Sequence, residues 1–195
     1  MRLSLQVWLT LAAAVSQAAT WQIDSAHSGA QFTVRHMMVS NIRGEMGGLK
    51  GKVEYDPAHP ERSSVEVSID VSTINTREPK RDAHLKSADF FDVEKFPAIA
   101  FRSRRVEVAG PGKLKAIGDL TMHGVTREVV LDVDAPAEPV TMRGTLRTGA
   151  TATTTISRKD FGMTWNRAIE TGGVAVSDAV AITIDVAMTR PAETK

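Results

Sequence analysis

Residues 73–97 carry the side chains with the clearest binding chemistry. Within this segment Arg81, His84 and Lys86 could donate hydrogen bonds to a pyrophosphate, a quinone carbonyl or an amide. An arginine guanidinium suits a phosphate because its planar fork can make two hydrogen bonds at once. A structural role is the alternative: Arg81 or Asp82 could attach the segment to the fold through an ion pair, and His84 could simply pack. We predict a head-group site at these three basic residues.

The same segment is the candidate for acid–base chemistry. Asp89 and Asp92 lie near His84 in the sequence, so a histidine–carboxylate pair could serve as a base on a lipid or an ester. The chain has no G-x-S-x-G elbow, no H-E-x-x-H motif and no phosphate-binding glycine loop. Its five histidines include no i, i+4 pair, and it has no cysteine. We therefore predict a binding protein with no catalytic residue and no metal, and keep a lipid- or ester-modifying enzyme that uses His84 as the alternative.

Apolar side chains around this segment could line a cavity. Three of the six phenylalanines follow directly after the basic residues. Small residues such as Ala116 and Ala152 would leave space inside a barrel, and the flexible thioether of methionine suits a wall that adapts to a long chain. Ordinary core packing is the alternative for several of them. The predicted lining residues are Phe32, Met38, Leu85, Phe90, Phe91, Phe96, Phe101, Leu120, Met122, Met163 and Trp165.

Alternating apolar residues predict β-strands over most of the chain. Strands are expected at residues 21–25, 29–36, 49–55, 65–71, 98–108, 113–122, 127–135, 143–156 and 179–189. Between two of them, Pro79 opens a run with helical spacing, at a position where its missing N–H has no helical partner to lose. Short turns and one apolar face per strand predict an all-β fold. We expect an eight-stranded antiparallel barrel with one short helical insertion.

The N-terminal residues have the organisation of a secretory signal peptide. Arg2 precedes an apolar run, and small residues allow cleavage after Ala18 or Ala19. The run is short for a bilayer span, although an N-terminal anchor is the alternative. We predict a signal peptide at 1–19, one domain at 20–190 and a disordered tail at 191–195. The net charge of +1 and the lack of a basic stretch interleaved with aromatic residues argue against nucleic acid as a partner.

Three segments, in this order, resemble the YceI-like family: INTREPKRDAHLKSADFFDVEKFPAIAF, GDLTMHGVTREVVLDV and SRKDFGMTWN. The resemblance implies a lipocalin-like barrel in the periplasm, not an integral membrane protein. It implies a long cavity for an amphipathic lipid, typically a polyisoprenoid such as an isoprenoid quinone or prenyl pyrophosphate, and in some members a fatty amide. Such a lipid would be a bound ligand, with no other cofactor. Relatives also suggest a homodimer and a link to cytochrome b-type membrane proteins. We therefore expect a periplasmic lipid carrier.

Overall fold

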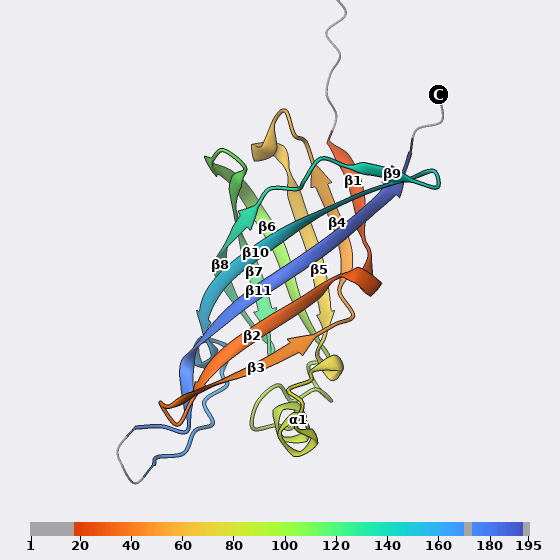
Figure 1. The fold of residues 1–195 in the computed structure, drawn as a ribbon. Coiled ribbons are helices and arrows are strands. Elements are labelled where there is room, and N and C mark those ends of the chain that lie inside the picture. Colours follow the sequence, from red (N-terminus) through yellow and green to blue (C-terminus); the bar gives the residue numbers. More distant parts are fainter. Residues whose placement is uncertain (1–17, 170–172, 193–195) are drawn as a thin grey trace, which may run out of the picture.

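The computed structural model describes residues 18–169 and 173–192, which form a mostly β structure (Figure 1). The strands are β1 (Ala19–Ile23), β2 (Gly29–His36), β3 (Ser40–Met46), β4 (Lys50–Tyr55), β5 (Ser64–Asp70), β6 (Ala98–Gly110), β7 (Lys113–Met122), β8 (Val125–Asp134), β9 (Val140–Met142), β10 (Thr145–Ser157) and β11 (Val176–Pro191). The helical elements are α1 (Pro79–Lys86) and the short 3-10 helices η1 (Ser25–His27), η2 (Pro60–Arg62), η3 (Val71–Thr73) and η4 (Arg158–Phe161). Of the predicted signal peptide only residues 18–19 are described, and of the predicted tail only residues 191–192, where Pro191 ends β11; the rest of both lies outside the described residues.

Eight of these strands close into an antiparallel barrel. The hydrogen-bonded order around the ring is β1, β4, β5, β6, β7, β8, β10 and β11, and β11 pairs again with β1 (Figure 1). Each ring strand places alternate side chains inside, as β5 does with Val65, Val67 and Ile69. The predicted eight-stranded barrel with one short helical insertion is confirmed.

Strands β2 and β3 extend the sheet beyond the ring. The N-terminal half of β11 pairs with β2, and β3 pairs with β2 as an edge strand. A bridge between Glu45 and Asn75 joins β3 to the chain that follows η3. The sequence analysis missed β3 because its glycine and methionine residues interrupt the apolar alternation. It also missed β9, a three-residue strand that pairs with β10.

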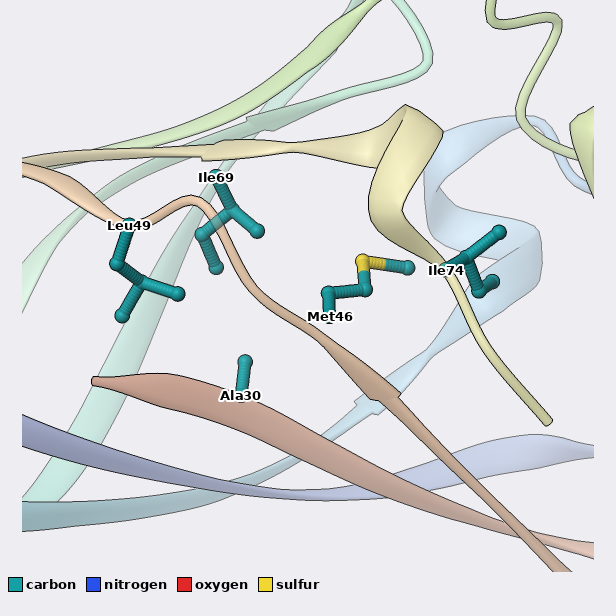
Figure 2. Close-up of a cluster of buried hydrophobic side chains, with 5 residues drawn as sticks. All are labelled: Ala30, Met46, Leu49, Ile69 and Ile74. Carbon is teal, nitrogen blue, oxygen red and sulfur yellow. The ribbon is translucent and has the colours of Figure 1, made fainter. Parts of the chain in front are cut away.

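A buried cluster ties these extra strands to the barrel. Ala30 of β2, Met46 of β3, Leu49 before β4, Ile69 of β5 and Ile74 after η3 converge in this cluster (Figure 2). Leu49 is fully buried, and burial of such a side chain contributes about 1.5–3 kcal/mol. The cluster thus anchors Ile74, in the chain that leads into α1.

Helix α1 lies across one end of the barrel (Figure 1). Pro79 occupies its first turn, as the sequence predicted, and the Glu78 side chain caps the start by accepting a hydrogen bond from the Lys80 N–H. The helix buries none of its residues completely. Its position therefore depends on polar contacts at its start and on the aromatic turns that follow its end.

Candidate ligand-binding cavity

A cavity of about 560 Å³ occupies the interior of the barrel. Its wall combines the inner faces of the ring strands with parts of β2, β3, α1 and residues 158–165 and 175–176. Ala116 of β7 and Ala150 and Ala152 of β10 lie in this wall, and side chains this small leave the interior incompletely filled. The volume lies within the range typical of small-molecule pockets.

One end of the cavity is closed by packed side chains. Val106, Leu114 and Leu131 lie in a buried cluster there, and Ser63 beside it is buried too. At the opposite end the wall includes Lys80, which is exposed. We call the first the closed end and the second, beside α1, the open end.

The charged residues of the cavity wall are all basic and lie at the open end. They are Lys80, Arg81 and Arg158, accompanied by His36 and His84. No aspartate or glutamate is among the lining residues that the described chain provides. Arg158 is paired with Asp178, so it is the charge of Lys80 and Arg81 that favours a negatively charged or strongly hydrogen-bond-accepting group at this end.

Arg81 is held at the wall by Thr76, a buried residue. Its Nε donates to Thr76 Oγ1 at 2.7 Å, and its Nη2 donates to the Thr76 carbonyl oxygen at 2.8 Å. The Asp82 carboxylate accepts from the Thr76 backbone N–H at 2.8 Å and from its hydroxyl. The expected attachment of α1 is thus present, but it is made by hydrogen bonds through Thr76 and not by an ion pair. The same bonds orient the guanidinium at the cavity wall.

His84 packs between two aromatic rings at the cavity wall. Its ring meets Phe90 edge-on at 5.1 Å and Trp165 at 4.9 Å between centroids. Its Nε2 lies 2.8 Å from Asp89 Oδ2. His84 therefore packs, as the structural alternative expected, and it also lines the cavity, while its role as a head-group donor stays a prediction.

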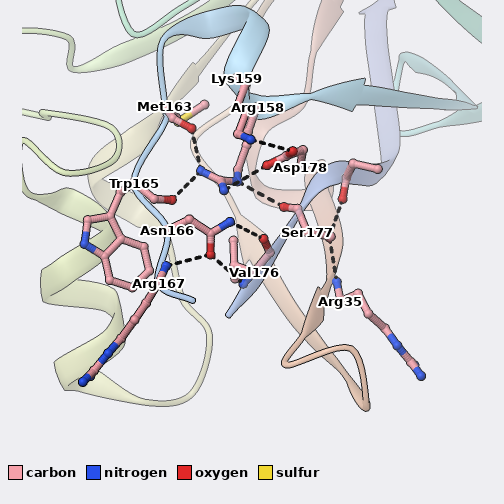
Figure 3. A network of polar contacts seen from close by, with 11 residues as sticks. Arg35, Arg158, Lys159, Met163, Trp165, Asn166, Arg167, Val176, Ser177 and Asp178 are labelled. Carbon is pink, nitrogen blue, oxygen red and sulfur yellow. Dashed lines mark hydrogen bonds and ion pairs between the residues drawn. The ribbon is translucent and has the colours of Figure 1, made fainter. Parts of the chain in front are cut away.

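Arg158 organises the loop on the other side of the open end. Only 4% of this residue is exposed, and burial lowers the pKa of its guanidinium while Asp178 acts to raise it. Nη1 donates to the carbonyl oxygens of Met163 and Trp165 at 2.5 and 2.8 Å, Nε donates to that of Ser177, and Nη2 pairs with Asp178 (Figure 3). The loop is folded around this side chain.

Arg158 is a site residue that the sequence analysis did not single out. It stands in the SRKDFGMTWN segment, where no periodicity marks it and Lys159 beside it looks equivalent. The nearest signal was the pair of apolar residues that follow, Met163 and Trp165. Their carbonyl groups must find donors if the loop covers an apolar interior, and a neighbouring arginine can supply several at once.

Most of the predicted residues line the cavity. They are Phe32, Arg81, His84, Leu85, Phe90, Phe91, Phe101, Leu120, Met122, Met163 and Trp165. Phe32, Phe101, Leu120 and Met122 reach the cavity from strands, and the others reach it from α1 and from the turns and loop at the open end.

The structure places the other three predicted residues away from the cavity wall. Lys86 adds its charge to the field at Asp70, whose pKa is lowered chiefly by hydrogen bonds from Ser72. Met38 is exposed in the β2–β3 turn. Phe96 packs edge-on against His123 of the β7–β8 turn, with ring centroids 5.1 Å apart.

Two further properties concern the described residues, 18–169 and 173–192. In them no three histidine, aspartate or glutamate side chains are grouped so that they could hold a metal ion. Nor does this part of the chain contain a helix with the length and apolar character needed to cross a membrane.

Comparison with known families agrees with this architecture. A family model described as the YceI-like domain matches residues 21–188. The chain belongs to the YceI-like family. A UPF0312 protein of Staphylococcus aureus is 37% identical to this YceI-like chain over 160 residues, which cover 80% of this chain and 90% of that protein.

Solved structures share the fold. The YCEI protein of Campylobacter jejuni superimposes with a TM-score of 0.68 at 29% identity, covering 80% of this YceI-like chain and 88% of that one. A polyisoprenoid binding domain from Saccharophagus degradans superimposes with a TM-score of 0.60 at 14% identity, covering 88% of this chain and 98% of that one. At such low identity the second likeness concerns the fold alone.

Proposed function

We propose that this YceI-like protein binds a long amphipathic lipid of the polyisoprenoid type and carries it through the periplasm. The observation that carries the proposal is the cavity itself: an apolar interior about 560 Å³ in volume whose charged residues are all basic and lie at one end. The structural neighbour described as a polyisoprenoid binding domain supports the same ligand class.

An apolar tail would supply most of the affinity. Each methylene transferred from water contributes about 0.8 kcal/mol, so ten of them contribute about 8 kcal/mol before the cost of immobilising the tail. The wall residues that would contact such a tail include Val67, Phe101, Leu120 and Met122. A methionine among them can adjust its rotamer to the branched methyl groups of an isoprenoid.

The head group would lie at the open end, near Arg81, His84 and Lys80. Both ligand types that the resemblance implies have acceptor oxygens: an isoprenoid quinone has carbonyl groups and a prenyl pyrophosphate has an anionic head. The all-basic charge of this end favours the pyrophosphate or another anionic head group, because no lining carboxylate would repel it.

The cellular part of the proposal depends on the predicted signal peptide at residues 1–19. An exported lipid carrier would operate between membranes or hold a reserve of lipid in the periplasm. The homodimer and the link to a cytochrome b-type membrane protein are further predictions from the family resemblance, and each requires its own test.

The first experiment is native mass spectrometry of the protein purified from its own host, with organic extraction of whatever is bound. A stoichiometric isoprenoid quinone or prenyl phosphate supports the carrier function. A barrel that carries no lipid and binds neither a quinone nor a prenyl pyrophosphate analogue at micromolar concentration contradicts it.

The His84–Asp89 pair supports one alternative, an enzyme that modifies a lipid or an ester with His84 as base. A histidine Nε2 that lies 2.8 Å from a carboxylate is an arrangement found in general-base catalysis. This alternative predicts that an extracted lipid is converted on incubation with the protein, and that the conversion ceases in His84→Ala while the lipid still binds. Unchanged lipid after prolonged incubation would refute it.

A further inference from the structure

The turn between β2 and β3 presents three apolar side chains to solvent. Met37, Met38 and Val39, here called the apolar tip, are 44%, 54% and 75% exposed. Met37 and Met38 have positive φ angles of 49° and 62°, and the Val39 N–H donates to the His36 carbonyl oxygen. A hairpin turn whose two central residues both have positive φ angles normally uses asparagine and glycine at those positions. Side chains with longer carbon chains are strained there. The methionines are therefore unfavourable both for the turn and for solubility.

Basic residues surround the apolar tip. Arg35 and Arg43 are exposed on the same face of the β2–β3 hairpin, and the sequence between them, HMMVSNI, contains no acidic residue. The Arg35 Nε donates to the Met38 carbonyl oxygen. Arg167 is close by, since the Ala175 N–H donates to its carbonyl oxygen and the Ala175 carbonyl oxygen accepts from the Met37 N–H. The tip is thus apolar at its apex and cationic at its base.

The apolar tip also adjoins the open end of the cavity. His36 directly precedes it and pairs with Val176 of β11, and both residues line the cavity. Figure 1 shows the β2–β3 turn and α1 at the same end of the barrel. Whatever the tip contacts is therefore held beside the entrance to the apolar interior.

We propose that the apolar tip inserts into the surface of a lipid bilayer that carries anionic head groups, so that the open end of the cavity faces the membrane. A few exposed apolar side chains with arginines behind them match an interface whose outer layer is negatively charged and whose interior is apolar. Three side chains on a turn are too small a surface for a specific protein partner, whose interfaces bury about 1,200 Å² or more. Only the purpose of this membrane binding, which is to pass a lipid between membrane and barrel, rests on the proposed function.

Vesicle co-sedimentation tests the proposal directly. Protein expressed from the full 195-residue sequence and purified in its exported form is mixed with vesicles of phosphatidylglycerol and phosphatidylethanolamine, or of phosphatidylcholine alone. We expect binding to the anionic vesicles that weakens as salt is raised. Replacing Arg43 or Arg167 by glutamine should weaken binding about fivefold for each charge removed.

The chain offers a matched control for the apolar side chains. The double variant Met37→Asn with Met38→Gly places the preferred turn residues at the tip and removes its methionines, so it should remain folded and bind anionic vesicles about tenfold or more weakly. The control, Val140→Ser with Met142→Ser, removes exposed apolar side chains from β9 at the closed end, and it should bind vesicles as the unmodified protein does.

A tryptophan placed at each site reports where the membrane lies. Relative to the unmodified protein, whose Trp165 lies at the open end, phospholipids brominated on their acyl chains should quench the fluorescence that Val39→Trp adds and not the fluorescence that Val140→Trp adds. If neither vesicle type binds the protein, or if the tip variant and the β9 variant bind equally, the proposal is overturned and a protein partner becomes the occupant to seek. Lipid extraction from the same preparations distinguishes the two proposals: a protein with bound lipid but no vesicle binding disproves docking alone, and the reverse result disproves the carrier function alone.

Discussion

Each end of the barrel carries a similar short hairpin, but the barrel interior next to the two hairpins differs. Both carry exposed methionine and valine on a short turn or strand, and both have a turn residue other than glycine at positive φ, Met38 at one end and Arg143 at the other. At the closed end a buried apolar cluster fills the interior. At the open end the interior is covered by α1 and a loop held by polar contacts. Packing provides stability at the closed end, and access to the cavity is retained at the open end.

This difference has an energetic reason. A filled interior gains dispersion and hydrophobic energy that an empty one loses. The open end compensates by concentrating hydrogen bonds on two residues, Thr76 and Arg158, each of which satisfies several partners. Such networks are expensive to disturb, because the loss of one side chain leaves several buried groups without a partner. Substitutions at the open end should therefore act mainly through lost hydrogen bonds, and those at the closed end mainly through lost packing.

The largest effect is expected for Arg158→Met. The carbonyl groups of Met163, Trp165 and Ser177 would lose a buried donor, which should lower the free energy of unfolding by about 3–5 kcal/mol. Urea denaturation measures the loss. Lys159→Met is the control: Lys159 contacts the same Asp178 but is exposed, so its replacement should cost less than about 1 kcal/mol. Equal losses in the two variants would show that the loop does not depend on the buried guanidinium.

Filling the cavity should weaken binding, with a smaller loss of stability than Arg158→Met causes. Ala152→Phe places a ring inside the wall on β10, and we expect the affinity for a prenyl analogue to fall at least about tenfold, the equivalent of roughly 1.4 kcal/mol. The matched change Ala181→Phe lies on the outer face of the neighbouring β11 and should leave the affinity unchanged. Fluorescence titration compares them, and an unaffected Ala152→Phe would mean that the ligand lies elsewhere.

A matched pair of threonines should separate binding from stability. Thr76→Val removes the hydroxyl that joins Arg81 to Asp82 at the open end, and we expect a loss of about 1–2 kcal/mol of stability together with weaker head-group binding. Thr148→Val removes a hydroxyl that donates to the Ala137 carbonyl oxygen near the closed end. It should cost about 1 kcal/mol or less and leave binding intact, as thermal denaturation and ligand titration would show.

The last pair of variants should gain stability. Met37→Asn with Met38→Gly relieves the positive φ angles of the apolar tip and should raise the free energy of unfolding by about 1–2 kcal/mol. Arg143→Asn, in the turn after β9, should give about 1 kcal/mol or less, since Gly144 already occupies the next position. Urea denaturation of both variants tests the comparison; destabilisation of the tip variant would show that the methionines contribute to packing.

The open end also shows how far the sequence could predict the site. Pro79 marked the start of α1, and of the three phenylalanines after it that were expected to line the cavity, Phe90 and Phe91 do so. Phe90 and Phe96 belong to the same short run, yet Phe90 faces the cavity while Phe96 packs against His123. Nothing in the local pattern distinguishes them, because the turns between them have no regular period.

The sequence alone determined where the ring strands lie, the inward face of each and the position of the single helix, although nine strands were expected and one of them, β2, lies outside the ring. These depend on a side-chain period of two, on prolines and on turn residues, all of which are local properties. Only the tertiary structure decided that basic residues gather at one end of the cavity, that Arg158 holds the loop beside it, and that two methionines adopt positive φ angles next to its entrance. Those features depend on which distant segments meet when the sheet closes, and contacts of that kind leave no trace in local periodicity.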